Sequence, residues 1–360
     1  MKKIRVASLF SGIGGFEEGF NKSKLKYDLV FSSEIDKYAT LTYGSNFQTD
    51  NMYGDIKLVN EETIPDHDLL CAGFPCQSFS VAGKRKGFND IRGTLFFDVV
   101  RIIKCKKPKI VFLENVKNLV SHDESNTIKT ILKNISDCGY TFDFTIINSN
   151  EAGVPQSRER TYIVGVLNYK TEKFEEDIRS PKVSEIKKWA NHRKLNTMNF
   201  FNKIDIKKRT KYIVDILENN VDKKYLIDNE KLSIYLNSNI AEYNEKKQRK
   251  IIKELDLPRD IHNDLERQRR VYSIYGISPT LLARSDSPKV LLKNDNIFFI
   301  RKLTPYETLR VQGFNDKYVE NVKKIAMSDT QLYKQAGNAV SPPVITEITN
   351  NILEQFYEEI

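Results

Sequence analysis

The sequence predicts an α/β protein with a second, smaller domain inserted into the first, and three observations support this architecture. The first 170 residues alternate short apolar runs with amphipathic stretches, which is typical of a sheet flanked by helices. From about residue 169 to residue 300 that alternation is lost and charged residues become frequent, before residues 301–360 return to compact sequence. A length of 360 residues fits two domains. We expect one domain formed by residues 1–175 and 301–360, with residues 176–300 inserted between them.

Short apolar runs are the predicted strands, and stretches with apolar residues at helical spacing are the predicted helices. In chain order the strands are Ile4–Phe10, Asp28–Ser33, Asp68–Ala72, Lys109–Leu113, Phe144–Asn148 and Tyr162–Leu167. The helices are Lys37–Phe47, Thr94–Lys104, Thr127–Cys138 and Val344–Tyr357. The last helix follows the compact block that begins at Arg301, so the carboxyl terminus is predicted to return to the first domain.

Composition excludes several classes of protein. Forty per cent apolar and 29% charged residues are typical of a globular chain rather than a disordered or collagen-like one. No run approaches the roughly 20 apolar residues that cross a bilayer, and the amino terminus lacks the apolar core of a secretory signal. The four cysteines and four histidines lack the spacing of a disulfide framework or a metal site, so no metal is expected. These observations predict a cytoplasmic protein with reduced thiols.

The net positive charge is concentrated in one third of the chain. Residues 181–300 hold 25 Lys and Arg residues against 16 Asp and Glu residues, an excess of nine, and the whole chain carries +9. The other 240 residues are therefore neutral overall. A basic segment of this kind is expected where a protein faces a polyanion such as nucleic acid. A lysine-rich, solvated surface is the alternative interpretation.

Three candidate cofactor contacts lie in the first domain, and two of them directly follow predicted strands, at the strand ends where open α/β sheets bind ligands. The glycine-rich turn Phe10–Phe16 lets a ligand lie against the backbone. Glu34 stands 22 residues beyond Gly12, which suits a carboxylate that accepts from a ribose diol, although an exposed surface glutamate is the alternative. Asp55 offers an acceptor for an adenine amino group. Together they favour an adenosyl cofactor, and the turn departs from the G-x-G-x-x-G pattern of nicotinamide dehydrogenases.

A thiol, a carboxylate and two guanidinium groups form the candidate catalytic set. Cys76 follows Gly73–Pro75 at the end of a predicted strand, where a turn holds a thiol toward a cleft. Glu114 stands at the end of the next predicted strand, and the pair favours covalent catalysis coupled to proton transfer. Arg158 and Arg160 precede another strand, and side chains two residues apart on extended backbone point the same way. The other cysteines are predicted packing residues, namely Cys71, Cys105 and Cys138.

Taken in chain order, these blocks make the sequence resemble the bacterial DNA (cytosine-5) methyltransferases, which use S-adenosylmethionine. The resemblance rests on Pro-Cys-Gln, Glu-Asn-Val, Gln-Ser-Arg-Glu-Arg and Gln-Ala-Gly-Asn-Ala-Val occurring in family order. The matching blocks are Phe10–Phe16, Glu34, Gly54–Ile56, Gly73–Ser80, Gly93–Arg101, Glu114–Val116, Gln156–Gly165, Arg301–Phe314 and Gln335–Val344. The resemblance implies a Rossmann-like class I methyltransferase domain with a mostly parallel sheet. It also implies a smaller target-recognition domain at residues 176–300, because such enzymes vary there and residues 181–265 do not match usefully.

The resemblance assigns each catalytic residue a role on cytosine. The Cys76 thiolate attacks C6 and forms a covalent adduct, and C5 then takes the methyl group before a base removes its proton and Cys76 is released. Glu114 is similar to the glutamate that holds N3 and the exocyclic amine. Arg160 resembles the arginine that contacts the base carbonyl, and Arg158 helps to order the nucleophile. The target cytosine must be flipped out of the duplex to reach these groups.

The same resemblance implies which residues bind the cofactor and the DNA. The cofactor is S-adenosyl-L-methionine, with S-adenosyl-L-homocysteine as product and no metal. The expected cofactor-binding residues are Phe10, Gly12, Gly14, Glu34, Ile35, Asp55, Ile56, Leu95 and Asn338. The expected DNA-binding residues are Phe74, Pro75, Gln77, Ser80, Arg269, Arg270 and Tyr272. Core packing is the alternative role for Ile35, Ile56 and Leu95.

The expected partner is double-stranded DNA. We expect a monomeric enzyme of the bacterial cytosol or nucleoid, within a restriction-modification system whose restriction endonuclease acts separately. Two other functions stay open, namely an RNA cytosine-5 methyltransferase of the same architecture and a DNA-binding regulator that kept the fold and lost catalysis. The intact set of Cys76, Glu114, Arg158 and Arg160 argues against the regulator.

Overall fold

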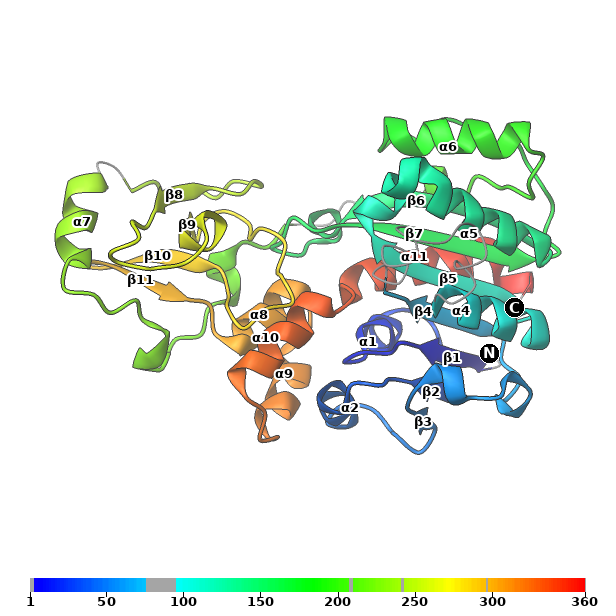
Figure 1. The fold of residues 1–360 in the computed structure, drawn as a ribbon, viewed down its shortest axis with the longest axis horizontal. Helices are drawn as coiled ribbons and strands as arrows, with labels where there is room; N and C mark the ends of the chain where they lie inside the picture. Colours follow the sequence, from blue (N-terminus) through cyan, green and yellow to red (C-terminus); the bar gives the residue numbers. More distant parts are fainter. Residues whose placement is uncertain (1–2, 76–94, 207–209, 241–242, 296, 360) are drawn as a thin grey trace. The chain divides into compact units, whose positions relative to one another are not determined.

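The computed structural model describes residues 3–75, 95–206, 210–240, 243–295 and 297–359 (Figure 1). The chain folds into two compact units, each assembled from distant parts of the sequence. Unit 1 comprises Met1–Asn148, Glu159–Ile206 and Val344–Ile360, and unit 2 comprises Ser149–Arg158 and Lys207–Pro343. The units differ from the predicted domains at residues 176–206, which belong to unit 1, and at residues 149–158 and 301–343, which belong to unit 2. A target-recognition role for residues 176–300 stays a prediction.

Unit 1 is built on a seven-stranded sheet in the order β3-β2-β1-β4-β5-β7-β6. The strands are β1 (Ile4–Leu9), β2 (Tyr27–Ser33), β3 (Met52–Tyr53), β4 (Leu69–Gly73), β5 (Ile110–Val116), β6 (Tyr140–Asn148) and β7 (Glu159–Leu167). Strands β1 to β5 are parallel, whereas β7 pairs antiparallel with β5 and β6. The predicted α/β class and mostly parallel sheet are therefore confirmed. All six predicted strands are present, with shifted ends, and β3 is an addition.

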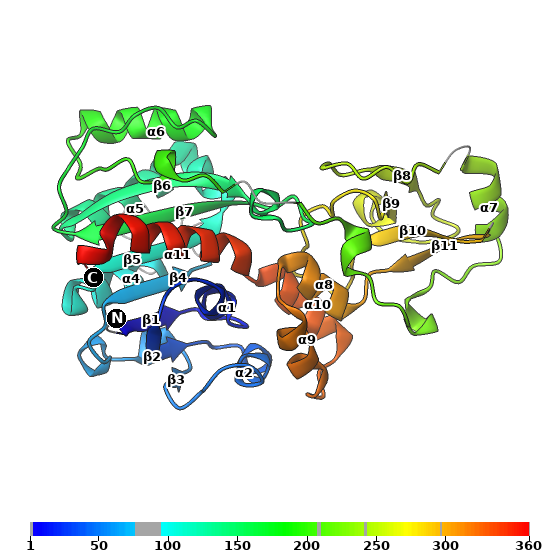
Figure 2. The same cartoon turned by 180° about the vertical axis from the view of Figure 1, so that it is seen from behind.

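Helices cover both faces of this sheet. α1 (Gly15–Lys22) and α11 (Pro342–Phe356) lie over one face, and α4 (Leu95–Lys106) and α5 (Asn126–Asp137) lie over the other (Figure 1, Figure 2). Thr346 on α11 donates to the carbonyl of Gly19 on α1 at 2.9 Å, so the carboxyl terminus returns to the sheet as predicted. α2 (Lys37–Gly44) follows β2 and is capped by Asp36, whose carboxylate accepts from two backbone N–H groups.

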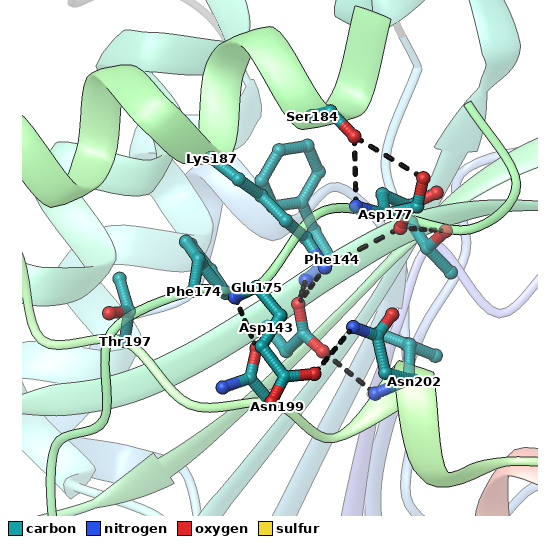
Figure 3. Close-up of polar contacts among 12 residues, drawn as sticks. Asp143, Phe144, Phe174, Glu175, Asp177, Ser184, Lys187, Thr197, Asn199 and Asn202 are labelled. Atoms are coloured by element: carbon teal, nitrogen blue, oxygen red, sulfur yellow. Dashed lines mark hydrogen bonds and ion pairs between the residues drawn. The ribbon is translucent and has the colours of Figure 1, made fainter. Parts of the chain in front are cut away.

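A buried ion cluster attaches residues 176–206 to unit 1. Lys187 on α6 (Pro181–His192) points toward two carboxylates, 2.9 Å from Asp143 on β6 and 3.4 Å from Asp177 (Figure 3). All three side chains are buried, and Asp143 also accepts from the backbone N–H of Phe201 at 2.7 Å. Buried charges are costly unless they are paired and hydrogen-bonded. These contacts therefore fix α6 beside β6.

Unit 2 contains a four-stranded sheet in the order β11-β10-β9-β8, in which β9 and β10 are parallel and the outer pairs are antiparallel. The strands are β8 (Lys253–Asp256), β9 (Arg270–Ser273), β10 (Lys289–Asn294) and β11 (Ile297–Lys302). The α-helices are α7 (Leu232–Asn239), α8 (Pro305–Gln312), α9 (Asp316–Lys323) and α10 (Asp329–Asn338). α7 packs its leucines against β9, β10 and β11. No helix in the described part of the chain is long and apolar enough to cross a membrane.

Candidate active site

The carboxyl ends of four parallel strands meet at one edge of the unit 1 sheet. Leu9 at the end of β1 pairs with Ser33 on β2 and with Ala72 on β4. Gly73 on β4 pairs with Glu114 on β5. The loops after β1, β2 and β4 therefore leave the sheet at the same edge, beside Glu114, which is where open α/β sheets bind ligands.

The turn after β1 leaves room beside its backbone. Gly12 and Gly14 have φ values of 57° and 85°, in the left-handed region that favours glycine. A Cβ at Gly14 would lie 2.2 Å from the ring of Phe47, so packing alone requires glycine there. A Cβ at Gly12 would meet nothing within 4 Å. Phe10 has φ 56° and packs partly against the core, so the strained start of the turn is held by its side chain. The open space beside Gly12 is accessible to a ligand.

Glu34 is fixed against this turn by two backbone N–H groups. Its Oε2 accepts from Gly12 and its Oε1 accepts from Asp36, both at 2.8 Å. A carboxylate offers about four lone-pair positions, so each oxygen can still accept from a further donor. The predicted ribose acceptor and the predicted glycine turn are therefore direct neighbours in the structure.

The remaining unit 1 cofactor candidates divide between surface and core. Asp55 caps η1 (Ile56–Leu58) by accepting from Lys57 N–H at 3.0 Å through Oδ1. Ile35 is 72% exposed, which is unusual for a large apolar side chain and leaves it open to a ligand. Ile56 is only 3% exposed and belongs to the core, which agrees with the alternative interpretation of this residue as a packing residue. Leu95 begins α4 and packs partly against the same core.

Glu114 and Arg160 form a partly shielded ion pair at the end of β5. Their strands are antiparallel neighbours, with Val116 opposite Arg160. The Arg160 Nε lies 3.3 Å from the Glu114 Oε1, and the two side chains are only 14% and 10% exposed. An ion pair that is largely removed from water interacts more strongly than a surface pair. The pairing fixes the orientation of the carboxylate beside the end of β4.

Asn115 is a residue that sequence reasoning did not select. Its Nδ2 donates to the carbonyl of Phe74 at 2.7 Å, and its Oδ1 accepts from the backbone N–H of Val116 at 2.8 Å. It thus ties β5 to the residue that follows β4. The sequence signal that could have pointed to Asn115 is its place inside the Glu-Asn-Val block. Phe74 itself is buried against Phe96 on α4, so a DNA contact by this residue would have to come from its backbone.

The predicted nucleophile follows Pro75, which is exposed and is the last residue described before residue 95. Cys76, Gln77 and Ser80 lie outside the described residues. Cys71 is fully buried on β4, and burial raises the pKa of its thiol. The packing role predicted for Cys105 is wrong, because this residue is exposed on α4, whose buried face is formed by Phe96, Val99, Val100, Ile102 and Ile103.

Three of the matching sequence blocks meet within unit 2. The Nη2 of Arg158 donates to the carbonyl of Ala339 at 2.9 Å, and Nε2 of Gln312 donates to the same oxygen. Gln156 is joined to Gln312 by a side-chain hydrogen bond of 2.5 Å. Arg158 is therefore bound to the block that contains Asn338, which is exposed at the end of α10. The roles predicted for Arg158 and Asn338 at the nucleophile and the cofactor stay predictions.

The three predicted DNA-binding residues of unit 2 are engaged in contacts within that unit. Arg269 ends η10 (Glu266–Arg269) and donates to the carbonyl of Leu257 at 2.6 Å. Arg270 pairs with Glu266 at 3.0 Å, and this hydrogen bond raises the pKa of Arg270. Tyr272 is buried on β9. Their DNA contacts stay predictions.

One cluster in unit 2 brings potential metal-ligating atoms together. Single atoms of His262, Asp264 and Asp286 lie within 4.8 Å of one another. Asp286, however, is already paired with Lys289 and Lys302, each at 2.9 Å. Two neighbouring ammonium groups oppose the binding of a metal cation. We therefore assign no metal to this cluster.

Comparisons with known proteins give a consistent result. A family model described as C-5 cytosine-specific DNA methylase matches residues 4–354. The type II methyltransferase M1.ScrFI of Lactococcus lactis subsp. cremoris is 38% identical over 356 residues, which cover 98% of this chain and 78% of the relative. The type II methyltransferase M.HhaI of Haemophilus parahaemolyticus is 36% identical over 352 residues, which cover 97% of this chain and 94% of the relative. A solved methyltransferase structure from Entamoeba histolytica shares the fold, with a TM-score of 0.68, 18% identity and 99% coverage of both chains.

Proposed function

Because this chain belongs to the C-5 cytosine-specific DNA methylases, we propose that it methylates C5 of a cytosine within a specific sequence of double-stranded DNA. It is a DNA (cytosine-5-)-methyltransferase with a Rossmann-like fold, and S-adenosyl-L-methionine is the proposed methyl donor. The observation that carries the proposal is the Glu114–Arg160 pair, which lies one strand from the strand that leads to Cys76.

The proposed chemistry begins with the Cys76 thiolate, which adds to C6 of the cytosine and makes C5 nucleophilic. Glu114 holds the exocyclic amine and N3, and so offsets the charge that the addition places on the ring. Arg160 orients Glu114 through the 3.3 Å contact and donates to the base carbonyl. After C5 has taken the methyl group, a base removes its proton and the bond to Cys76 breaks. The cytosine must leave the duplex for these groups to reach it.

The residues of unit 1 fit an adenosyl methyl donor. Glu34 keeps acceptor capacity for a ribose diol and lies against the open space at Gly12. Asp55 supplies an acceptor near an adenine amine, and exposed Ile35 supplies an apolar surface for the ring. When bound, S-adenosyl-L-methionine carries its methyl group on a sulfonium, which makes that group transferable to C5.

The names of the relatives support a role in a type II restriction-modification system. We infer that a restriction endonuclease acts separately, that this protein works as a monomer in the bacterial cytoplasm, and that it reads DNA mainly through residues 176–300. The basic excess of residues 181–300 supports that assignment.

The direct test is bisulfite sequencing of plasmid DNA incubated with the purified protein and S-adenosyl-L-methionine. We expect protection of one cytosine in every copy of a single sequence word. A Cys76→Ser variant and a reaction without the cofactor are the controls. Methylation of transfer RNA in parallel, with unmodified DNA, would contradict the proposal and favour an RNA methyltransferase.

A further inference from the structure

Residues 267–270 of unit 2 form an arginine-rich run, Arg-Gln-Arg-Arg, in which the first two side chains differ from the last two in their contacts. Arg269 and Arg270 are held by the Leu257 carbonyl and by Glu266, as described above. The side chains of Arg267 and Gln268 make no hydrogen bond or ion pair with the residues that the structure describes. Arg267 is exposed and Gln268 is half-buried. These two side chains are therefore available for contacts with a ligand.

Both side chains line a small concave surface that opens to solvent. Tyr272, Thr280 and the segment 286–288 form other parts of its wall. Arg270 also lines it, but its charge is already matched by Glu266. Asp286, the one carboxylate among the described residues of the wall, is matched by Lys289 and Lys302. Arg267 therefore supplies the unmatched charge of this surface.

The surface behind these side chains is rigid. Lys289, which is buried, donates to the backbone carbonyl of Gln268 at 2.8 Å. Thr280 donates to the carbonyl of Ser157 at 2.6 Å. A Cβ at Gly337 on α10 would lie 2.3 Å from the backbone of Leu282, so the chain after Thr280 packs closely on that helix. Little ordering is needed in the wall when a ligand binds, which favours discrimination between similar ligands.

The chemistry of the pair fits the edges of bases better than phosphate. An arginine donates to O6 and N7 of guanine at once, and a glutamine pairs in the same way with adenine. Phosphate contacts position a protein on the duplex but carry no sequence information, whereas an adjacent arginine and glutamine offer the donor and acceptor patterns that read two neighbouring bases. We propose that Arg267 reads one guanine of the recognition sequence in the major groove and that Gln268 contacts the neighbouring base pair. This inference rests on the proposed function, and it makes Arg267 the specificity-determining residue rather than Arg269.

The test uses the sequence word that bisulfite sequencing identifies. Duplexes are prepared in which each guanine of the word is replaced in turn by 7-deazaguanine, which lacks the N7 acceptor but pairs normally. For the wild type we expect kcat/KM to fall roughly tenfold at one position, because a good bidentate contact discriminates by about 1–3 kcal/mol. Arg267→Ala should methylate the normal duplex more slowly and show no further loss at that position. Arg267→Lys keeps the charge but loses the forked donor, and it should behave in the same way.

Arg259→Ala is the matched control, because Arg259 is an exposed arginine of unit 2 that does not line the concave surface. It should keep the wild-type response to every 7-deazaguanine. The inference is overturned if Arg267→Ala still loses activity at the same position, or if Arg267→Lys restores the wild-type pattern, since a phosphate contact needs only charge. If the wild type methylates DNA but Arg267→Ala shows the wild-type response to every 7-deazaguanine, the inference fails and the proposed function stands. If the wild type methylates no DNA cytosine, the proposed function fails and the inference falls with it.

Discussion

The side-chain amide of Asn115 donates a hydrogen bond to the carbonyl of Phe74 at 2.7 Å and thereby joins the carboxyl ends of β5 and β4. Its oxygen accepts from the backbone N–H of Val116, so both polar ends of the side chain are used. The backbone at Phe74, directly before Pro75, is therefore fixed relative to the strand that carries Glu114.

Replacing Asn115 should therefore lower the rate of methyl transfer more than it lowers affinity for the cofactor. We expect Asn115→Ala to reduce kcat by roughly 10- to 100-fold, because small displacements of reacting groups are costly. Asn118→Ala, a nearby exposed asparagine, is the control. Steady-state kinetics and cofactor titration measure the two effects. A wild-type kcat for Asn115→Ala in a folded protein would show that the hydrogen bond does not position the nucleophile.

The acceptors of the cofactor site give the second prediction. Glu34→Ala and Asp55→Ala should each weaken binding of S-adenosyl-L-methionine several-fold to tenfold, since one hydrogen bond is worth about 0.5–1.5 kcal/mol. Asp50→Ala, an exposed carboxylate of the same unit, should leave the affinity unchanged. Isothermal titration calorimetry decides the matter. Equal affinities for the wild type and for both site variants would place the cofactor elsewhere.

The buried ion cluster gives the third prediction. Lys187→Met leaves Asp143 and Asp177 buried without their cation, and breaking such a cluster typically costs about 3–5 kcal/mol. Lys188→Met is a matched control on the same helix, because its pair with Glu176 is exposed to solvent and therefore contributes little to stability. Urea unfolding followed by circular dichroism compares the two. Similar unfolding midpoints for both variants would mean that the cluster does not hold α6 to the sheet.

A buried carboxyl group on α1 gives a pH-dependent prediction. Glu17 is fully buried and accepts from the hydroxyl of Tyr43 at 3.3 Å, and burial raises its pKa above the ordinary value of 4.5. The folded state then holds this proton more tightly than the unfolded state. The free energy of unfolding should therefore fall as pH rises from about 4.5 through the raised pKa.

Glu17→Gln cannot titrate, so its stability relative to the wild type should increase across that interval. Thermal unfolding of both proteins from pH 4.5 to pH 8 measures the difference, and effects of all other groups cancel in the comparison. A difference in melting temperature that is constant with pH would show that Glu17 titrates as it does in the unfolded chain.

The sequence predicted the strand ends of the site because apolar runs and turn residues are local signals. It placed the start of β6 too late, at Phe144 instead of Tyr140, because Asp143 interrupts the apolar run. The residue that neutralises Asp143 is Lys187, which no local pattern connects to β6. The same cause explains the segment 176–206, whose charges indicated an inserted domain although two of its charged side chains, those of Asp177 and Lys187, are buried in unit 1.

The site residues likewise divide into those that local sequence signals reveal and those whose roles depend on tertiary contacts. Glu34 and Glu114 were found because they follow or end predicted strands. Asn115 was not, because its role depends on the carbonyl of Phe74, which is a tertiary contact. The difference between Arg267 and Arg269 was equally hidden, since it depends on the Leu257 carbonyl that only Arg269 reaches.

The central claim is that Cys76 forms a covalent bond to the target cytosine, and mass spectrometry of the denatured complex tests it most directly. The substrate is a duplex with 5-fluorocytosine at the methylated position, because fluorine cannot leave C5 as a proton does and the adduct then persists. In the presence of S-adenosyl-L-methionine we expect one methylated DNA strand bound per protein, on the peptide that contains Cys76. Cys76→Ser should form none, while Cys138→Ser should form as much as the wild type. Methylation of ordinary DNA without any adduct, or an adduct on another residue, would contradict the account.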